Sequence, residues 1–116
     1  MKEKKDPKIF LRHVLESIDR IENDLTGLSE VKFSKSLTIQ DAVVRRLEII
    51  SEAVRNLPDP FRKKYPEIAW KKIAGMRDVL IHEYFGVDME LVWKIAKNDI
   101  PKLKKQIVIL LKKIQA

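Results

Sequence analysis

Four polar side chains that can take part in chemistry lie within the run Arg77-Asp78-Val79-Leu80-Ile81-His82-Glu83-Tyr84. A histidine with an ordinary pKa of about 6.5 can move protons at neutral pH, and an arginine can bind a phosphate through two parallel N–H groups. Arg77 and His82 therefore suit phosphodiester transfer. RNA carries its own nucleophile, the 2′-hydroxyl, so a protein needs to supply only a base, an acid and a cation. The pattern favours RNA over DNA and predicts a 2′,3′-cyclic phosphate product, formed without a divalent metal.

The spacing of these residues determines which of them can meet on one helix. Asp78 and His82 are one turn apart, so the carboxylate can hold the imidazole and fix its tautomer. Arg77 and Tyr84 share another stripe of the helix. Arg77 and His82 are about 140° apart around an ideal helix and do not converge. Either the helix unwinds at its end, or a second copy of the chain completes the site.

Apolar residues recur at spacings of three and four in the first half of the chain, which predicts two amphipathic helices. Gly27 ends the first helix, and Thr38 predicts the N-cap of the second. Residues 27–37 are predicted to be a loop that Val31, Phe33 and Leu37 anchor to the core. The two stripes are Leu11, Val14, Leu15, Ile18, Ile21 and Leu25, followed by Ile39, Val43, Leu47, Ile50, Val54 and Leu57.

Prolines and predicted capping positions divide the second half of the chain. Pro58 and Pro60 end the second helix, residues 59–65 form a turn or a single helical turn, and Pro66 opens a third helix that ends at Gly86. Asp88 caps a fourth helix, and Pro101 starts or kinks the last one. No stretch alternates in the manner of a strand. The predicted fold is an all-α, up-and-down bundle of four to five helices in a single domain that spans residues 1–116.

Composition excludes several classes of function. At 116 residues the chain has room for one hydrophobic core. It has no cysteine, which excludes disulfides, cysteine-bound zinc and thiol nucleophiles, and its two histidines argue against a multi-histidine metal site. We expect no cofactor. The charged first eight residues lack the apolar stretch of a signal peptide, and no apolar run reaches the roughly 18 residues of a membrane span, so we expect a cytoplasmic protein.

The positive charge is unevenly distributed along the chain. The net charge is +7, and residues 59–116 hold 13 basic against 7 acidic residues. This asymmetry indicates either an anionic partner or a lysine-rich face that is simply solvated, and charge alone leaves both open.

Other residues of chemical interest have a structural explanation. His13 is predicted to be a partly buried polar residue of the first helix, not a catalytic one. Trp70 and Trp93 lie among apolar residues and are predicted to belong to the core or to a dimer interface, not to stack on bases. Glu48 and Glu52 are one turn apart, and helix-surface charge explains them better than a metal site does.

The run Arg77 to Tyr84, followed by Phe85-Gly86-Val87-Asp88, resembles the Arg-x-x-x-x-His-x-Tyr signature of HEPN-domain ribonucleases, specifically the HepT-like toxins of prokaryotic toxin–antitoxin pairs. The resemblance covers nearly the whole chain. It includes residues 41–53, which are similar to the family's second-helix segment, and residues 66–70, 92–93 and 99–101. Ser51 departs from the pattern, because the family commonly has glycine there.

The resemblance implies a homodimer in which two copies of the motif face one cleft. It implies a metal-independent endoribonuclease with Arg77 and His82 as the catalytic pair and Asp78 in support. It also implies a nucleotidyltransferase antitoxin that attaches AMP units to Tyr84 and so silences the nuclease. Two other functions stay open: a non-catalytic helical module that binds a nucleotidyltransferase, and a small basic dimer that binds nucleic acid.

Overall fold

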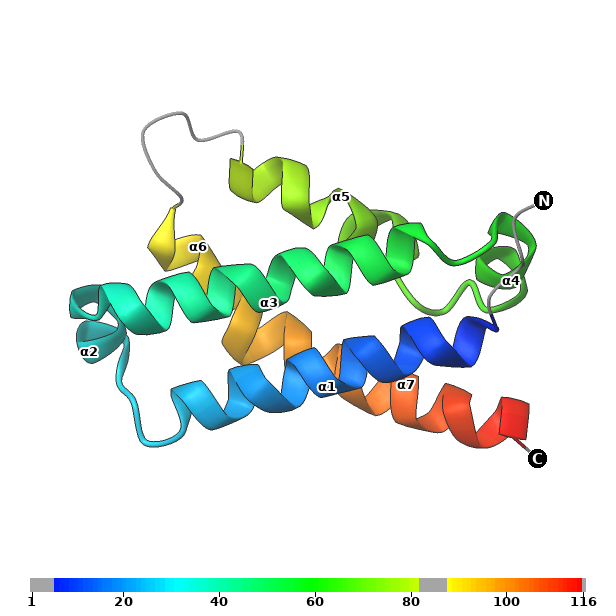
Figure 1. Cartoon of the computed structure of the whole chain (residues 1–116), viewed down its shortest axis with the longest axis horizontal. Coiled ribbons are helices and arrows are strands. Elements are labelled where there is room, and N and C mark those ends of the chain that lie inside the picture. The colour runs from blue at the N-terminus through cyan, green and yellow to red at the C-terminus, as the bar shows by residue number, and fades with distance from the viewer. Residues whose placement is uncertain (1–5, 82–87, 116) are drawn as a thin grey trace.

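The main helices of the bundle run antiparallel to their neighbours along the chain (Figure 1). A computed structural model describes residues 6–81 and 88–115. Its long elements are α1 (Pro7–Leu25), α3 (Leu37–Arg55), α5 (Trp70–Ile81) and a continuous run of α6 (Met89–Lys94), η1 (Ile95–Asp99) and α7 (Ile100–Gln115). Two short helices, α2 (Glu30–Lys35) and α4 (Asp59–Lys64), lie in the connections. No strand occurs in the described ranges, and the predicted all-α, up-and-down bundle is confirmed.

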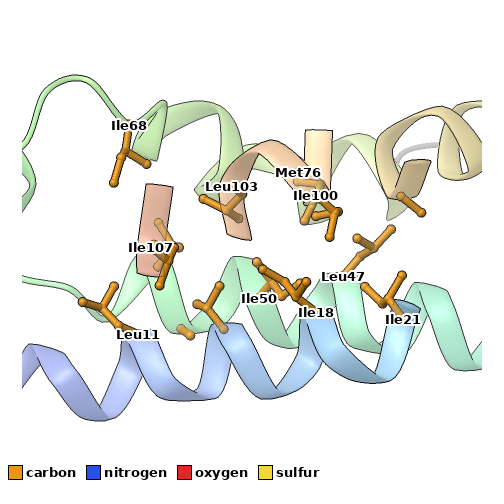
Figure 2. Packing of buried hydrophobic residues seen from close by; sticks show 14 of the residues in the cluster. Leu11, Ile18, Ile21, Leu47, Ile50, Ile68, Met76, Ile100, Leu103 and Ile107 are labelled. Atoms are coloured by element: carbon orange, nitrogen blue, oxygen red, sulfur yellow. The ribbon is translucent and has the colours of Figure 1, made fainter. Parts of the chain in front are cut away.

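The apolar stripes of the long helices meet in one core (Figure 2). Leu11 and Ile18 of α1 and Leu47 and Ile50 of α3 are fully buried, as the periodicity predicts. Residues of α5 and α7 cover this pair of helices from the other side, and they include Met76, Leu80, Ile100, Leu103 and Ile107. Because α3 packs against both α1 and α5, it is the element that fixes the position of the candidate motif on α5.

The connection between α1 and α3 differs from the prediction of a loop. Ser29 caps the short helix α2 by accepting a hydrogen bond from the backbone N–H of Lys32 at 3.2 Å. Of the three predicted anchors, Phe33 alone is buried, at 1% exposure, whereas Val31 is 62% exposed and Leu37 is 74% exposed. A helix this short turns one face to the core, and Val31 and Phe33 point to opposite sides because they are two residues apart. The prediction that all three anchor the core is therefore wrong for Val31 and Leu37.

Two predicted helix starts are displaced. The N-cap of α3 is Ser36, whose Oγ accepts from the N–H of Ile39 at 3.3 Å, so the prediction of Thr38 is wrong by two residues. The helix α5 begins at Trp70, and Pro66 lies in the turn that precedes it. The indole of Trp70 donates to the carbonyl of Tyr65 at 2.9 Å and holds this turn folded under the helix. A side-chain hydrogen bond within the turn thus accompanies a helix start four residues after Pro66, against the preference of proline for a first helical position.

The predicted fourth and last helices form one continuous run. The N-cap of α6 is Asp88, as predicted, and its carboxylate accepts from the N–H groups of Glu90 and Leu91. The π-helical segment η1 then leads into α7, and the N–H of Ile100 donates to the carbonyl of Ile95, five residues back. Pro101 lacks an N–H and its ring displaces the carbonyl four residues earlier, so a wider turn is the local solution that lets the helix continue.

No helix in the described part of the chain is long and apolar enough to cross a membrane.

Candidate active site

The sequence motif lies only partly within the described residues. Arg77 and Asp78 are on α5, one turn before its end at Ile81. His82, Tyr84 and the predicted cap Gly86 lie outside the described residues, so the relative placement of Arg77 and His82 stays a prediction. The described geometry concerns how α3 holds the two motif residues on α5.

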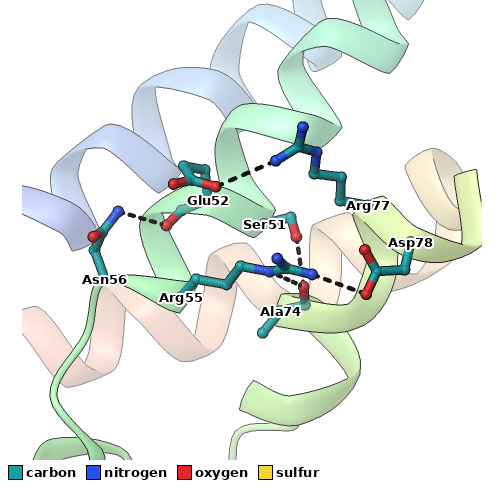
Figure 3. Close-up of polar contacts among 7 residues, drawn as sticks. All are labelled: Ser51, Glu52, Arg55, Asn56, Ala74, Arg77 and Asp78. Atoms are coloured by element: carbon teal, nitrogen blue, oxygen red, sulfur yellow. Dashed lines mark hydrogen bonds and ion pairs between the residues drawn. The ribbon is translucent and has the colours of Figure 1, made fainter. Parts of the chain in front are cut away.

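Two side chains of α3 bind the same backbone carbonyl of α5 (Figure 3). Ser51 Oγ and Arg55 Nε each donate to the carbonyl oxygen of Ala74 at 2.8 Å. Ser51 is fully buried, so its hydroxyl needs this partner. Ser51, the residue that departs from the family pattern, therefore connects α3 to α5 through a hydrogen bond to Ala74, one helical turn before Asp78.

Arg55 also contacts the motif directly. Its Nη2 donates to Asp78 Oδ2 at 3.0 Å, so a single guanidinium spans the Ala74 carbonyl and the Asp78 carboxylate. The Asp78 side chain is 68% exposed and the Arg55 side chain 37% exposed. Sequence reasoning missed Arg55. The one available signal is that Arg55 follows Ser51 by four residues and therefore shares its face of α3.

The other motif residue, Arg77, is paired with Glu52. Arg77 Nη1 lies 3.7 Å from Glu52 Oε2, which is an ion pair but longer than a hydrogen bond. The two side chains are 44% and 58% exposed. Glu52 is a surface charge, as predicted, yet it is also the group that turns Arg77 toward α3. A loose, solvated pair of this kind contributes little binding energy, so the guanidinium can exchange Glu52 for a phosphate.

Arg77 borders an open hollow of about 440 Å³ between α1, α3 and α5. His13, Arg45 and Asn56 line the same hollow. The prediction that His13 is partly buried is wrong, because its side chain is exposed and faces away from the stripe of α1 that carries Leu11 and Val14. The structure thus brings His13 to the surface region that Arg77 occupies, a juxtaposition that 63 intervening residues conceal in the sequence.

The two tryptophans occupy structural positions. Trp70 is 5% exposed and belongs to the core, as predicted. Trp93 is half-buried and packs on Phe33, with ring centroids 5.3 Å apart, and the Lys97 ammonium lies over the Trp93 ring. Within residues 6–81 and 88–115, no group of three histidine, cysteine or acidic side chains is placed to hold a metal ion.

Comparison with known proteins identifies the family. The family model described as "Ribonuclease HepT-like" matches residues 14–110 of this chain. "Probable ribonuclease HepT" of Thermococcus cleftensis is 45% identical over 101 residues, which are 87% of this chain and 92% of that protein. A "Putative RNase" of Caldanaerobacter subterraneus is 45% identical over 109 residues, which are 94% of this chain and 97% of that protein. The chain belongs to the ribonuclease HepT-like family, as the motif predicts.

A larger protein is also similar to this chain. "Gamma-glutamylcyclotransferase and putative RNase" of Methanocaldococcus jannaschii is 54% identical over 105 residues, which cover 90% of this chain. They cover 47% of that protein, so the chain spans about half its length. No solved structure matches the chain.

Proposed function

We propose that this chain is a metal-independent endoribonuclease toxin of a toxin–antitoxin pair. The observation that carries the proposal is the state of Arg77 in a chain of the ribonuclease HepT-like family: an exposed guanidinium at the edge of a hollow, whose one ion pair among the described residues is the loose pair with Glu52. Such a group can bind the phosphate of an RNA strand through its paired N–H donors.

The reaction uses the nucleophile that RNA supplies. The 2′-hydroxyl oxygen attacks the neighbouring phosphorus, the bond from phosphorus to the 5′-oxygen breaks, and a 2′,3′-cyclic phosphate forms. His82 serves either as the general base that takes the proton of the 2′-hydroxyl or as the general acid that protonates the departing 5′-oxygen, which leaves as a hydroxyl. Arg77 stabilises the charge that builds on the phosphoryl oxygens, and Asp78, held by Arg55, supports the pair as a positioning residue.

A homodimer is part of this proposal. One straight helix points Arg77 and His82 about 140° apart, so the working pair forms across two copies that face one cleft. The side chain of Val79, on the same helix, is 52% exposed and lines an apolar groove of about 320 Å³ beside α7. An exposed apolar groove next to the motif supports association of two chains.

Control by a nucleotidyltransferase antitoxin completes the proposal. The antitoxin attaches AMP units to Tyr84. The attached AMP adds bulk and negative charge close in sequence to Arg77, and its phosphate competes with RNA for the Arg77 guanidinium. Co-expression with such an enzyme should raise the intact mass by whole AMP units, and Tyr84→Phe should abolish the increase. An increase that survives Tyr84→Phe would place the modification on another residue.

The test of the nuclease is RNA cleavage in EDTA by protein that mass spectrometry shows to be free of AMP. We expect the wild type to cut and to leave 2′,3′-cyclic ends, and we expect Arg77→Ala and His82→Ala to lose the activity. Arg12→Ala is the matched control, because Arg12 is an exposed arginine of α1 that borders none of the hollows described above. Absence of cleavage by the wild type would favour the non-catalytic module that binds a nucleotidyltransferase.

A further inference from the structure

We infer that the surface formed by α1 and α3 is the RNA-binding track of this protein, and that Arg45, Arg46 and His13 hold the phosphates next to the one bound by Arg77. The inference rests on the proposed function, because it takes Arg77 as the arginine that binds the scissile phosphate. It adds the path of the strand and the residues that hold it, all of which lie outside the sequence motif.

The direction of the Arg77 side chain sets where the strand must pass. Its guanidinium points from α5 toward Glu52 on α3, with α1 on the far side of α3 (Figure 3). The hollow that it borders is lined by His13 of α1 and Arg45 of α3. A phosphate that replaces Glu52 on Arg77 therefore lies at the edge of this hollow, and the adjoining nucleotides on one side lie over α1 and α3.

A second hollow continues the first along the same two helices. It has a volume of about 340 Å³, shares Arg45 with the first hollow, and is lined also by Arg20 and Arg46. The two helices lie side by side along this stretch (Figure 1). The arginines thus lead from Arg77 past Arg45 to Arg46 at the middle of α3 and to Arg20 on the neighbouring α1.

Two arginines of this row, Arg45 and Arg46, are not neutralised by a carboxylate of the described residues, and Arg45 is exposed. No ion pair joins Arg45 or Arg46 to a carboxylate in the part of the chain that the structure describes. Arg20 is paired with Glu16 at 3.9 Å, beyond hydrogen-bond length. Asp24 and Glu48 also line the hollows, so the attraction is local and not a broad positive field. A phosphate is attracted where it meets an arginine and repelled where it meets one of these carboxylates. This pattern suits an RNA strand, whose phosphates are spaced along its backbone.

The shape and chemistry of the track point to single-stranded RNA held by its backbone. Both hollows are open to solvent and neither encloses a base, so contacts to phosphate and ribose dominate. Arginine binds phosphate through a planar fork, whereas lysine acts as a point charge. The charge count of the sequence directs attention to the lysines of residues 59–116, but the arginines beside Arg77 lie in the nearly neutral first half.

The test measures binding separately from cleavage, in a His82→Ala background that leaves the RNA intact. The probe is a fluorescein-labelled oligouridylate of about 12 nucleotides, titrated at several salt concentrations. For Arg45→Gln/Arg46→Gln we expect affinity to fall about ten-fold at roughly 0.1 M salt, and the slope of log affinity against log salt to decrease by about 1.4, since each phosphate contact on a single strand contributes about 0.7. His13→Gln should weaken binding less, because an imidazole can offer one N–H group to a given phosphate, whereas a guanidinium offers two.

The matched control is Lys112→Gln/Lys113→Gln, which removes the same charge from the end of α7, where neither hollow lies. It should leave the affinity within about two-fold. Arg45→Lys/Arg46→Lys should keep the salt slope, because the charges remain. If the arginine pair has no larger effect than the lysine pair, or if the parent protein does not bind the RNA at low salt, the inference is overturned.

Cleavage kinetics separate this inference from the proposed function. In protein with His82 intact, Arg45→Gln/Arg46→Gln should raise KM and leave kcat nearly unchanged, as expected for loss of binding that is uniform along the reaction. If the wild type cuts RNA and the arginine variant has the same KM, the RNA-binding track is refuted and the nuclease is not. A wild type that binds RNA through Arg45 and Arg46 but never cuts it would refute the nuclease alone.

Discussion

Removal of Arg55 should destabilise the fold more than removal of its acidic partner. Arg55→Ala deletes two contacts: the hydrogen bond from Nε to the Ala74 carbonyl at 2.8 Å and the ion pair with Asp78 at 3.0 Å. A hydrogen bond from a charged group contributes about 1.5–3 kcal/mol, and the lower end applies here because the side chain is 37% exposed and Ser51 still serves the carbonyl. An exposed ion pair adds about 0.2–1 kcal/mol. We therefore expect a loss of about 2 kcal/mol.

Asp78→Ala deletes only the ion pair and should cost about 0.2–1 kcal/mol. In a double-mutant cycle the two substitutions should show a coupling of about that same size, because the ion pair is the interaction they share. Thermal unfolding followed by circular dichroism measures all four proteins. For a chain of this length, 2 kcal/mol lowers Tm by roughly 6–12 °C.

The comparison of the two single variants is the decisive result. Equal losses for Arg55→Ala and Asp78→Ala would mean that the bond to the Ala74 carbonyl adds nothing, and that Arg55 does not join α3 to α5. Arg55→Lys sharpens the test, because a lysine can reach one of the two acceptors but cannot span both. It should recover less than half of the lost stability, and full recovery would refute the argument from the two-point contact.

Three further perturbations test the fold. Phe33→Ala should cost about 3–5 kcal/mol in urea unfolding, because this 1%-exposed ring anchors α2, whereas Val31→Ala on the same short helix should stay within about 0.5 kcal/mol; equal costs would contradict the assignment of the anchor. Ser51→Ala should cost about 1 kcal/mol, because it removes a buried donor to the Ala74 carbonyl while Arg55 still serves that acceptor; a neutral or stabilising result would exclude a structural role for the hydroxyl. The pKa of Lys104 is raised above 10.5 by its hydrogen bonds to Glu22 and Asp19, so the stabilisation is complete below that pH and is lost as the pH rises through the folded pKa. Unfolding curves of wild type and Lys104→Gln between about pH 8 and pH 12 should therefore converge at the alkaline end, and a constant difference would refute the linkage.

Periodicity predicts the long helices well because burial repeats along them at a fixed interval. The buried face of α1 carries Val14, Ile18 and Ile21, and the buried face of α3 carries Val43, Leu47 and Ile50. Short elements escape the same reasoning, since α2 has too few residues to show a period and its cap, Ser29, is one of several serines in the segment. The start of α5 escapes prediction for a different reason: proline favours a first helical position, but the hydrogen bond from the Trp70 indole to the Tyr65 carbonyl holds residues 65–70 in a turn, which the propensity of one residue does not reveal.

The candidate site shows the same division between local pattern and tertiary contact. Arg77 and Asp78 could be found because a motif places them in one run with His82. Arg55 could not, because the contact with Asp78 joins positions 23 residues apart on two different helices, and no short pattern contains both. The motif therefore predicts which groups can react, while α3 determines where two of them point.

That division changes which charges matter for an anionic substrate. By sequence, the excess of positive charge lies in residues 59–116, and the first half, with 11 basic and 10 acidic residues, is nearly neutral. In the fold, Glu52 forms an ion pair with Arg77. Arg45 and Arg46 form no ion pair among residues 6–81 and 88–115. A region that is neutral by composition thus carries guanidinium groups without a carboxylate partner in the described residues, and one of them, the exposed Arg45, lines the same hollow as Arg77. Affinity for RNA should therefore follow the pairing of individual arginines and not the net charge of either half, and removal of equal charge from α3 and from α7 should have unequal effects.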